Sequence, residues 1–250
     1  MRKGKKRLAP VLLLGGSISL FLLSAVGSAR AALTYYSENY AMEVTVSSIG
    51  VTLEENEKTV SYRNYLENDW SDSGSGQLLQ HLTEEGAGKL EPGRQYPERL
   101  QVTNSGAIDS YVRVILYKSW QDEAGNKITT LSPDLIELEF TQDSGWVVDE
   151  KASTEERTVL YYTRPLLSGE RAPALCQSLC VAPEIFRRIR QETRTTEEGE
   201  IIHFSRQYEG CWMNLEAEVD AVQTHNAEEA IRSAWGVDVE IEEDGTLGLR

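Results

Sequence analysis

The chain has 250 residues, of which 25 are basic and 40 are acidic, so its formal net charge at pH 7 is −15. A protein this acidic repels phosphate backbones and anionic membrane surfaces, which argues against nucleic acid as a partner. Its length suits one large β domain or two small ones. With only three cysteines, the fold must be held by its hydrophobic core rather than by a disulfide scaffold.

The N-terminus has the organisation of a secretory signal peptide. Five basic residues without an acidic one precede an apolar stretch from Leu8 to about Val26, and a run of small residues follows. Ala29 and Ala31 fit the two small positions of an A-x-A cleavage site, so we expect a signal peptidase to cut before Ala32. An uncleaved anchor is the alternative, because about 19 apolar residues nearly span a bilayer. The glycines and serines within the stretch favour cleavage.

Removal of residues 1–31 leaves 219 residues with 19 basic and 40 acidic side chains, a net charge of −21. No later stretch approaches the length of a membrane span, so we expect a secreted protein with no lasting membrane anchor after cleavage. No linker or repeat divides residues 32–250, which predicts a single domain. Residues 54–95 are polar and rich in Ser and Gly, and they are predicted to form a long acidic insertion or loop with one short helix at most.

Period-two alternation of apolar residues recurs along the mature chain and predicts strands. Residues 110–120 alternate most strongly, and β-branched or aromatic residues occupy both faces, as in a central strand covered on both sides. Residues 215–222 alternate apolar with acidic residues, the pattern of a strand with one solvated face. Further strands are predicted at 42–53, 135–140, 159–162 and 201–204.

Short strands separated by Gly, Pro, Asn and Asp clusters predict an all-β fold, an antiparallel jelly-roll or immunoglobulin-like β-sandwich. One or two short helices interrupt this pattern. Residues 226–234 begin with Asn226 as an N-cap, and residues 183–192 begin with a proline suited to the first helical position.

The sequence contains no recognisable catalytic motif. None of His81, His203 and His225 belongs to a zinc-binding pattern, and no nucleophile elbow is present. We therefore predict no catalytic residues, no metal and no cofactor. The acidic loops 69–72 and 122–126 miss the calcium-loop spacing and are interpreted as solvated turns. The tryptophans indicate either core packing or a sugar-binding surface; they are Trp70, Trp120, Trp146, Trp212 and Trp235.

The cysteines are Cys176, Cys180 and Cys211. In an exported protein one disulfide among them is the expected state, and any of the three pairings is allowed by the sequence. The odd number leaves at least one thiol unpaired or available for a bond to another molecule.

Several short motifs, in order along most of the chain, resemble the TasA/camelysin-like family of Gram-positive bacteria, whose members are released by a dedicated signal peptidase. The motifs are Leu13-Leu14-Gly15-Gly16 in the signal, Ala32-Leu33-Thr34-Tyr35-Tyr36 at the mature start, Leu90-Glu91-Pro92-Gly93, Val102-Thr103-Asn104-Ser105-Gly106, Asp109 to Val114, Tyr161-Tyr162, Pro165 to Glu170, Glu216 to Gln223 and Ala234-Trp235-Gly236. The resemblance implies a jelly-roll-like sandwich exported to the cell surface or biofilm matrix, which in some members assembles into fibres. The three cysteines, the acidic insertion and the extension past Trp235 depart from the fibre-forming members.

The expected function is therefore that of a secreted, non-enzymatic structural protein of the cell surface or biofilm matrix. An exposed strand at the mature N-terminus can add to the sheet edge of a second copy or of another matrix subunit. The candidate donor strand is residues 34–46, with Thr34, Tyr36, Met42, Val44 and Val46 as its alternating residues. Pairing of this strand within its own sandwich is the alternative. The competing functions are a metal-dependent protease, which the resemblance to camelysins implies, and a glycan-binding adhesion module.

Overall fold

The structure is a computed structural model that describes residues 48–66, 69–80, 90–196 and 199–250. Ser47–Arg250 form one compact unit. The predicted signal peptide with Ala29, Ala31 and Ala32 lies outside the described residues, as does the predicted donor strand with Thr34, Tyr36, Met42, Val44 and Val46. In the part of the chain that is described, no helix is both long and apolar enough to cross a membrane.

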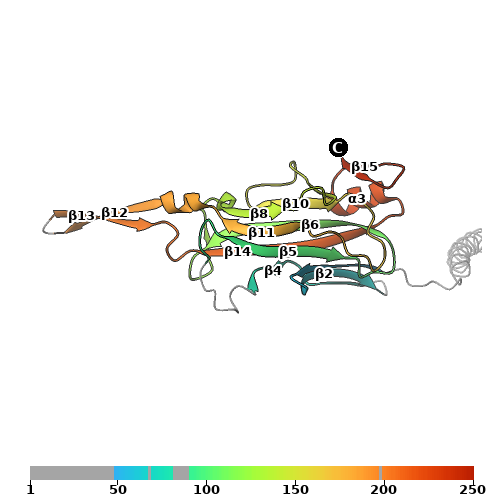
Figure 1. Ribbon diagram of the computed structural model, residues 1–250, viewed down its shortest axis with the longest axis horizontal. Helices are drawn as coiled ribbons and strands as arrows, with labels where there is room; N and C mark the ends of the chain where they lie inside the picture. The colour runs from blue at the N-terminus through green and yellow to red at the C-terminus, as the bar shows by residue number, and fades with distance from the viewer. Residues whose placement is uncertain (1–47, 67–68, 81–89, 197–198) are drawn as a thin grey trace, which may run out of the picture. The chain divides into compact units, whose positions relative to one another are not determined.

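The chain folds as an all-β sandwich of two antiparallel sheets (Figure 1). The first sheet has six strands in the order β3-β2-β1-β5-β11-β8. Their bounds are β1 Ile49–Glu55, β2 Lys58–Leu66, β3 Asp69–Asp72, β5 Gln95–Thr103, β8 Ile136–Phe140 and β11 Cys176–Val181.

The second sheet has the order β4-β14-β6-β10-β9, and β7 pairs with the end of β6. Its strands are β4 Gly76–Gln77, β6 Ser110–Gln121, β7 Lys127–Ile128, β9 Trp146–Val148, β10 Arg157–Tyr162 and β14 Trp212–Gln223. The two longest strands, β6 and β14, pair along their whole length, from Trp212 opposite Gln121 to Gln223 opposite Ser110. These two strands form the central part of this sheet.

The main hydrophobic core lies between the two sheets. Alternate residues of β6 and β14 point into it, as the sequence pattern predicts; they are Val112, Val114, Leu116, Trp120, Leu215, Ala217, Val219 and Ala221. The first sheet contributes Val51 and Leu53 from β1 and Leu100 and Val102 from β5, all fully buried. Burial of these side chains supplies most of the driving force for folding, since each contributes about 1.5–3 kcal/mol.

A second, smaller core covers part of the outer face of the second sheet. Tyr111 and Ile115 of β6 and Tyr161 of β10 pack there against residues after β14. The covering elements are helix α3 (Ala227–Trp235) and the hairpin of β15 (Val239–Ile241) with β16 (Leu247–Leu249). Both faces of β6 are thus covered from Ser110 to Leu116, which confirms the prediction of a doubly covered central strand for this part.

The prediction of a loop over residues 54–95 is wrong for much of that range. Residues 58–66 form β2, and β3 and β4 follow within the same segment. Apart from the buried Ser61, the side chains of β2 and β3 are half-buried or exposed on both faces, because these strands lie at the side of the sheet. A strand in that position needs no apolar alternation, so the sequence carries little sign of it.

The helix predicted at 183–192 is also wrong. Pro183–Arg187 form a short 3₁₀ turn, η2, and the chain continues as β12 (Ile189–Thr196). This strand pairs with β13 (Gly199–Arg206) in a separate two-stranded sheet. Although Pro183 suits the first position of a helix, residues 189–196 form a strand because they pair with β13. The other predicted helix is confirmed as α3, although Asn226 adopts a left-handed backbone (φ 51°) and its side chain makes no capping hydrogen bond.

Candidate functional site

One edge of β14 is open over about half of its length in the sense that its backbone forms no ladder there with any described residue, although β1 and β2 of the first sheet lie close to it. Within the described residues, its only ladder on that side is with β4, opposite Glu216 and Ala217. The N–H of Leu78 also donates to the C=O of Leu215 on that side (2.9 Å). Because backbone groups alternate in direction along a strand, the N–H and C=O of Val219 and Ala221 point the same way. The backbone groups of Val219 and Ala221 on that side therefore take part in no ladder among the described residues, and β2 is the neighbouring strand of the first sheet.

A buried ion-pair network lies beside this edge. Asp220, whose side chain is 4% exposed, accepts hydrogen bonds from Arg63 of β2 and from Arg113 of β6. The Arg113 guanidinium lies 5.1 Å from the Trp235 ring centroid, and that of Arg63 lies 4.7 Å from the Trp70 ring centroid. Asp220 thus connects the first sheet, the second sheet and α3. The predicted solvated face of β14 is wrong at Asp220, because two arginines compensate its burial.

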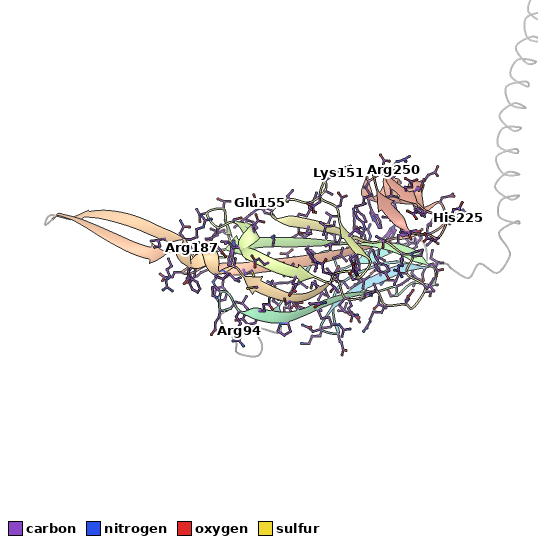
Figure 2. The ribbon with its side chains drawn as sticks, turned by 45° about the horizontal axis from the view of Figure 1, so that its top comes forward. Arg94, Lys151, Glu155, Arg187, His225 and Arg250 are labelled. Atoms are coloured by element: carbon purple, nitrogen blue, oxygen red, sulfur yellow. The ribbon has the colours of Figure 1, made fainter. Side chains whose placement is uncertain are left out.

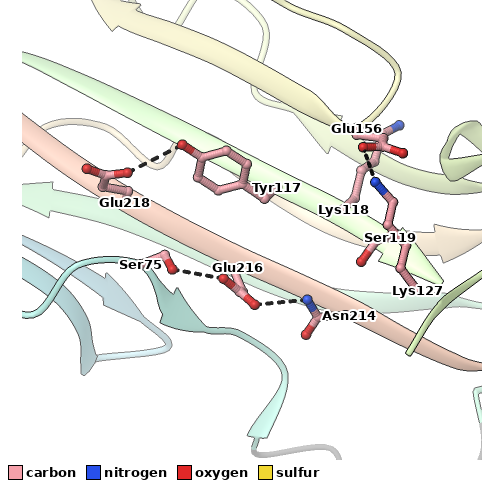
Figure 3. Close-up of a pocket in the computed structure, with 9 residues that line it drawn as sticks. All are labelled: Ser75, Tyr117, Lys118, Ser119, Lys127, Glu156, Asn214, Glu216 and Glu218. Carbon is pink, nitrogen blue, oxygen red and sulfur yellow. Dashed lines mark hydrogen bonds and ion pairs between the residues drawn. The ribbon is translucent and has the colours of Figure 1, made fainter. Parts of the chain in front are cut away.

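A polar groove of about 350 Å³ lies on the outer face of the second sheet, beyond the part covered by α3 (Figure 3). Its floor is formed by alternate residues of the central strands: Tyr117 and Ser119 of β6 and Asn214, Glu216 and Glu218 of β14. Its sides include Ser75, before β4, and the ion pair between Lys127 and Glu156 (2.5 Å). The volume falls within the usual range of small-ligand sites.

A pair of carboxyl groups is buried in the main core. Glu55 of β1 and Glu98 of β5 are 5% and 1% exposed. The Glu55 carboxylate accepts a hydrogen bond from the N–H of Leu79 (2.5 Å). Burial, together with the charge of Glu55 and the hydrogen bond to it, raises the pKa of Glu98 to about 9. Glu98 is therefore a neutral acid at pH 7. The sequence does not show that Glu55 and Glu98 lie next to each other, because that depends on the pairing of β1 with β5.

The three cysteines are thiols in the structure. Cys176 is fully buried, its thiol donates to the C=O of Glu98 (3.4 Å), and burial raises its pKa to about 12. Cys180 lies four residues further along the same strand, roughly 13 Å away in extended backbone. A disulfide requires Cα atoms within about 7 Å, so β11 does not allow the pairing of Cys176 with Cys180. Cys211 donates to the C=O of Gln207 (3.2 Å).

The remaining residues considered in the sequence are dispersed. His225 follows β14, His81 lies outside the described residues, and the side chain of His203 is likewise not described. In the described part of the chain, no group of three or more His, Cys, Asp or Glu side chains is placed to hold a metal ion. The Asp122 carboxylate accepts from the N–H groups of Ala124 and Asn126 and thereby closes a turn.

Comparison with known proteins gives no match to a family model, a curated protein or a solved structure. The candidate sites therefore rest on the geometry of this chain. Sequence reasoning singled out the strand 215–222 but not its open edge, and it named Trp212 but not the groove. The alternation of Glu216 and Glu218 on one face of a strand was the available signal for the groove. The residues opposite them become known only with the strand pairing.

Proposed function

We propose that this chain is a secreted, non-enzymatic structural protein of the cell surface or biofilm matrix of a Gram-positive bacterium, of the TasA/camelysin-like kind. We further propose that it self-associates when residues 34–46 of one copy add to the open edge of β14 in another. The observation that carries the proposal is this edge, where Val219 and Ala221 form a ladder with β6 only among the described residues; an added strand pairs there by displacing β2, which lies close to β14.

The place where the chain enters the sandwich is compatible with pairing of this segment to β14, in its own molecule or in a second copy. The N–H of Ala107 donates to the C=O of Ser48 (2.8 Å), and the N–H of Thr224, just after β14, donates to the C=O of Asp109 (3.3 Å). Ser48 therefore lies at the same end of the sandwich as the end of β14. Thirteen residues, 34–46, span roughly 43 Å when extended, which is enough to reach a second molecule.

Removal of part of the donor tests the proposal. A protein of residues 32–250 is expected to assemble, whereas one of residues 41–250 is expected to remain a folded monomer, because it lacks half of the donor strand. Both retain the compact unit Ser47–Arg250. Light scattering and electron microscopy measure the assembly, and circular dichroism checks the fold. Equal fibre formation by the two proteins would show that the donor is not this segment.

The acceptor is tested separately with a synthetic peptide of residues 34–46 and the protein of residues 41–250. The peptide is expected to bind this protein and not its Ala221→Pro variant. Proline removes the N–H of Ala221 that points to the open edge and leaves the ladder with β6 intact. Binding of the peptide to both proteins with one affinity would place the acceptor elsewhere. If residues 34–46 instead pair within their own sandwich, the protein of residues 32–250 will stay monomeric. That outcome would also contradict self-association.

A further inference from the structure

The groove on the outer face of the second sheet contains two carboxylates, those of Glu216 and Glu218. Glu216 accepts hydrogen bonds from the Ser75 hydroxyl (2.8 Å) and the Asn214 side-chain amide (2.9 Å), and Glu218 accepts one from the Tyr117 hydroxyl (3.4 Å) (Figure 3). These neutral donors hold the two carboxylates in place. Within the described residues, neither carboxylate forms an ion pair.

The cations near the groove are engaged by other groups. Lys127 pairs with Glu156 (2.5 Å), and the Lys118 ammonium donates to the C=O of Ile136 (3.2 Å). Arg157, opposite Tyr117 in the ladder, donates to the C=O of Ala152 (2.6 Å). The groove therefore presents two oriented carboxylates to solvent, and an external cation complements them.

Two aromatic side chains, Tyr117 and Trp212, lie on the same face of the sheet as these carboxylates. Tyr117 is half-buried in the floor, directly opposite Glu216 in the β6–β14 ladder. Trp212 lies two residues before Asn214 on the same face of β14, and it is 57% exposed. Trp212 and Glu216 are four residues apart, roughly 13 Å along the strand. Trp212 does not line the groove itself, but a tryptophan so exposed, next on this face after Asn214, offers an apolar face for a ligand that extends beyond the groove.

We propose that this groove binds an oligosaccharide that bears free amino groups. The Trp212 and Tyr117 rings provide flat faces for sugar rings, the hydroxyl and amide groups of Ser119 and Asn214 suit sugar hydroxyls, and Glu216 and Glu218 bind the ammonium groups. The separation between Trp212 and Tyr117 favours an oligosaccharide over a single sugar. The two carboxylates repel anionic polysaccharides, so the groove is expected to prefer polysaccharides with amino groups over acidic ones.

The inference gives the proposed matrix protein a polysaccharide partner, and its site does not depend on self-association. Binding is therefore measured with the protein of residues 41–250, which lacks half of the proposed donor strand. If binding occurs but assembly of residues 32–250 fails, only the self-association proposal is wrong. If assembly occurs but binding fails, only the present inference is wrong.

The test is isothermal titration at pH 6 with a glucosamine hexamer, its fully N-acetylated counterpart, an oligogalacturonate and penta-lysine. Binding is expected for the glucosamine hexamer alone, with an affinity that falls at high salt. Trp212→Ala and Tyr117→Ala are expected to weaken it at least tenfold, and Glu216→Gln to reduce the preference for the amino form. Trp70→Ala is the matched control, because Trp70 is also exposed (45%) but lies on β3 of the other sheet.

Trp212 is exposed, so its substitution is expected to leave the fold unchanged and tests the site even if Tyr117→Ala unfolds. Equal affinity for the acetylated hexamer, or for penta-lysine, would overturn the inference, since charge recognition of a sugar would then be absent. Unchanged affinity in the Trp212→Ala variant would overturn it as well.

Discussion

At the scale of single residues, the most unusual feature is a neutral acid in the main core. Glu98 faces the interior between Tyr96 and Leu100 on β5, and the carboxyl of Glu55 is beside it. The buried thiol of Cys176 contacts the backbone of the same residue. A buried carboxylate is costly unless it is paired with a cation, so the proton stays on Glu98.

Glu98 links the stability of the fold to pH. Its folded-state pKa of about 9 lies above the ordinary value of 4.5. Its stabilising contribution is therefore complete below pH 4.5 and is lost progressively as the pH rises toward 9. Glu98→Gln mimics the neutral acid and is expected to raise the free energy of unfolding at pH 7 by up to about 3 kcal/mol.

Urea unfolding of the wild type and of Glu98→Gln between pH 5 and 10 measures this difference. The gain is expected to grow with pH and to level off above pH 9. Glu137→Gln, at an exposed position of β8, is the matched control and should change little at any pH. A gain that does not vary with pH would contradict the assigned protonation state.

At the scale of elements, the segment after β14 acts as a cover for the second sheet. Val239 of β15 and Leu247 of β16 are both 2% exposed and pack with Ile231 of α3. The ammonium of Lys151 donates to the C=O of Arg250 (2.6 Å), and both residues lie at this end of the sandwich in Figure 2. The main core between the sheets does not include this segment.

Truncation after Gly236 removes β15 and β16 and tests the independence of the two cores. The sandwich is expected to stay folded, with a free energy of unfolding lowered by about 3–6 kcal/mol, because two fully buried apolar side chains are lost. Thermal unfolding measures the loss, and binding of a hydrophobic dye reports the exposed face around Ile115. An unchanged melting temperature would show that the hairpin contributes nothing to stability.

At the scale of the whole molecule, charge opposes association. Residues 32–250 carry a net charge of −21, so copies repel one another at low ionic strength. Screening shortens the range of this repulsion from roughly 30 Å at 0.01 M salt to 10 Å at 0.1 M. Assembly of residues 32–250 is therefore expected to be faster at 300 mM than at 10 mM NaCl, as measured by light scattering. The protein of residues 41–250 should stay monomeric at both concentrations, and faster assembly at low salt would contradict the proposal.

The sequence was most informative where alternation and burial coincide. In β6 and β14 the apolar residues that recur at every second position are the ones that fill the core, so both strands and the all-β class were predictable. It was least informative for β2 and β3, whose faces are partly exposed, and for β12, which is held by pairing with β13. These strands are held by pairing with neighbouring segments rather than by an apolar face, so they leave no period-two alternation in the sequence.

By itself, the sequence determined the predicted export signal, the acidic character and the sandwich class, because each follows from composition or from local periodicity. Only the tertiary structure decided that β14 has an open edge, that Asp220 is buried between two arginines and that Glu98 is neutral. It also brought Ser75 and Tyr117 to Glu216 and Glu218 in one groove. These features depend on which strands lie side by side, and residues far apart in the chain set that arrangement together.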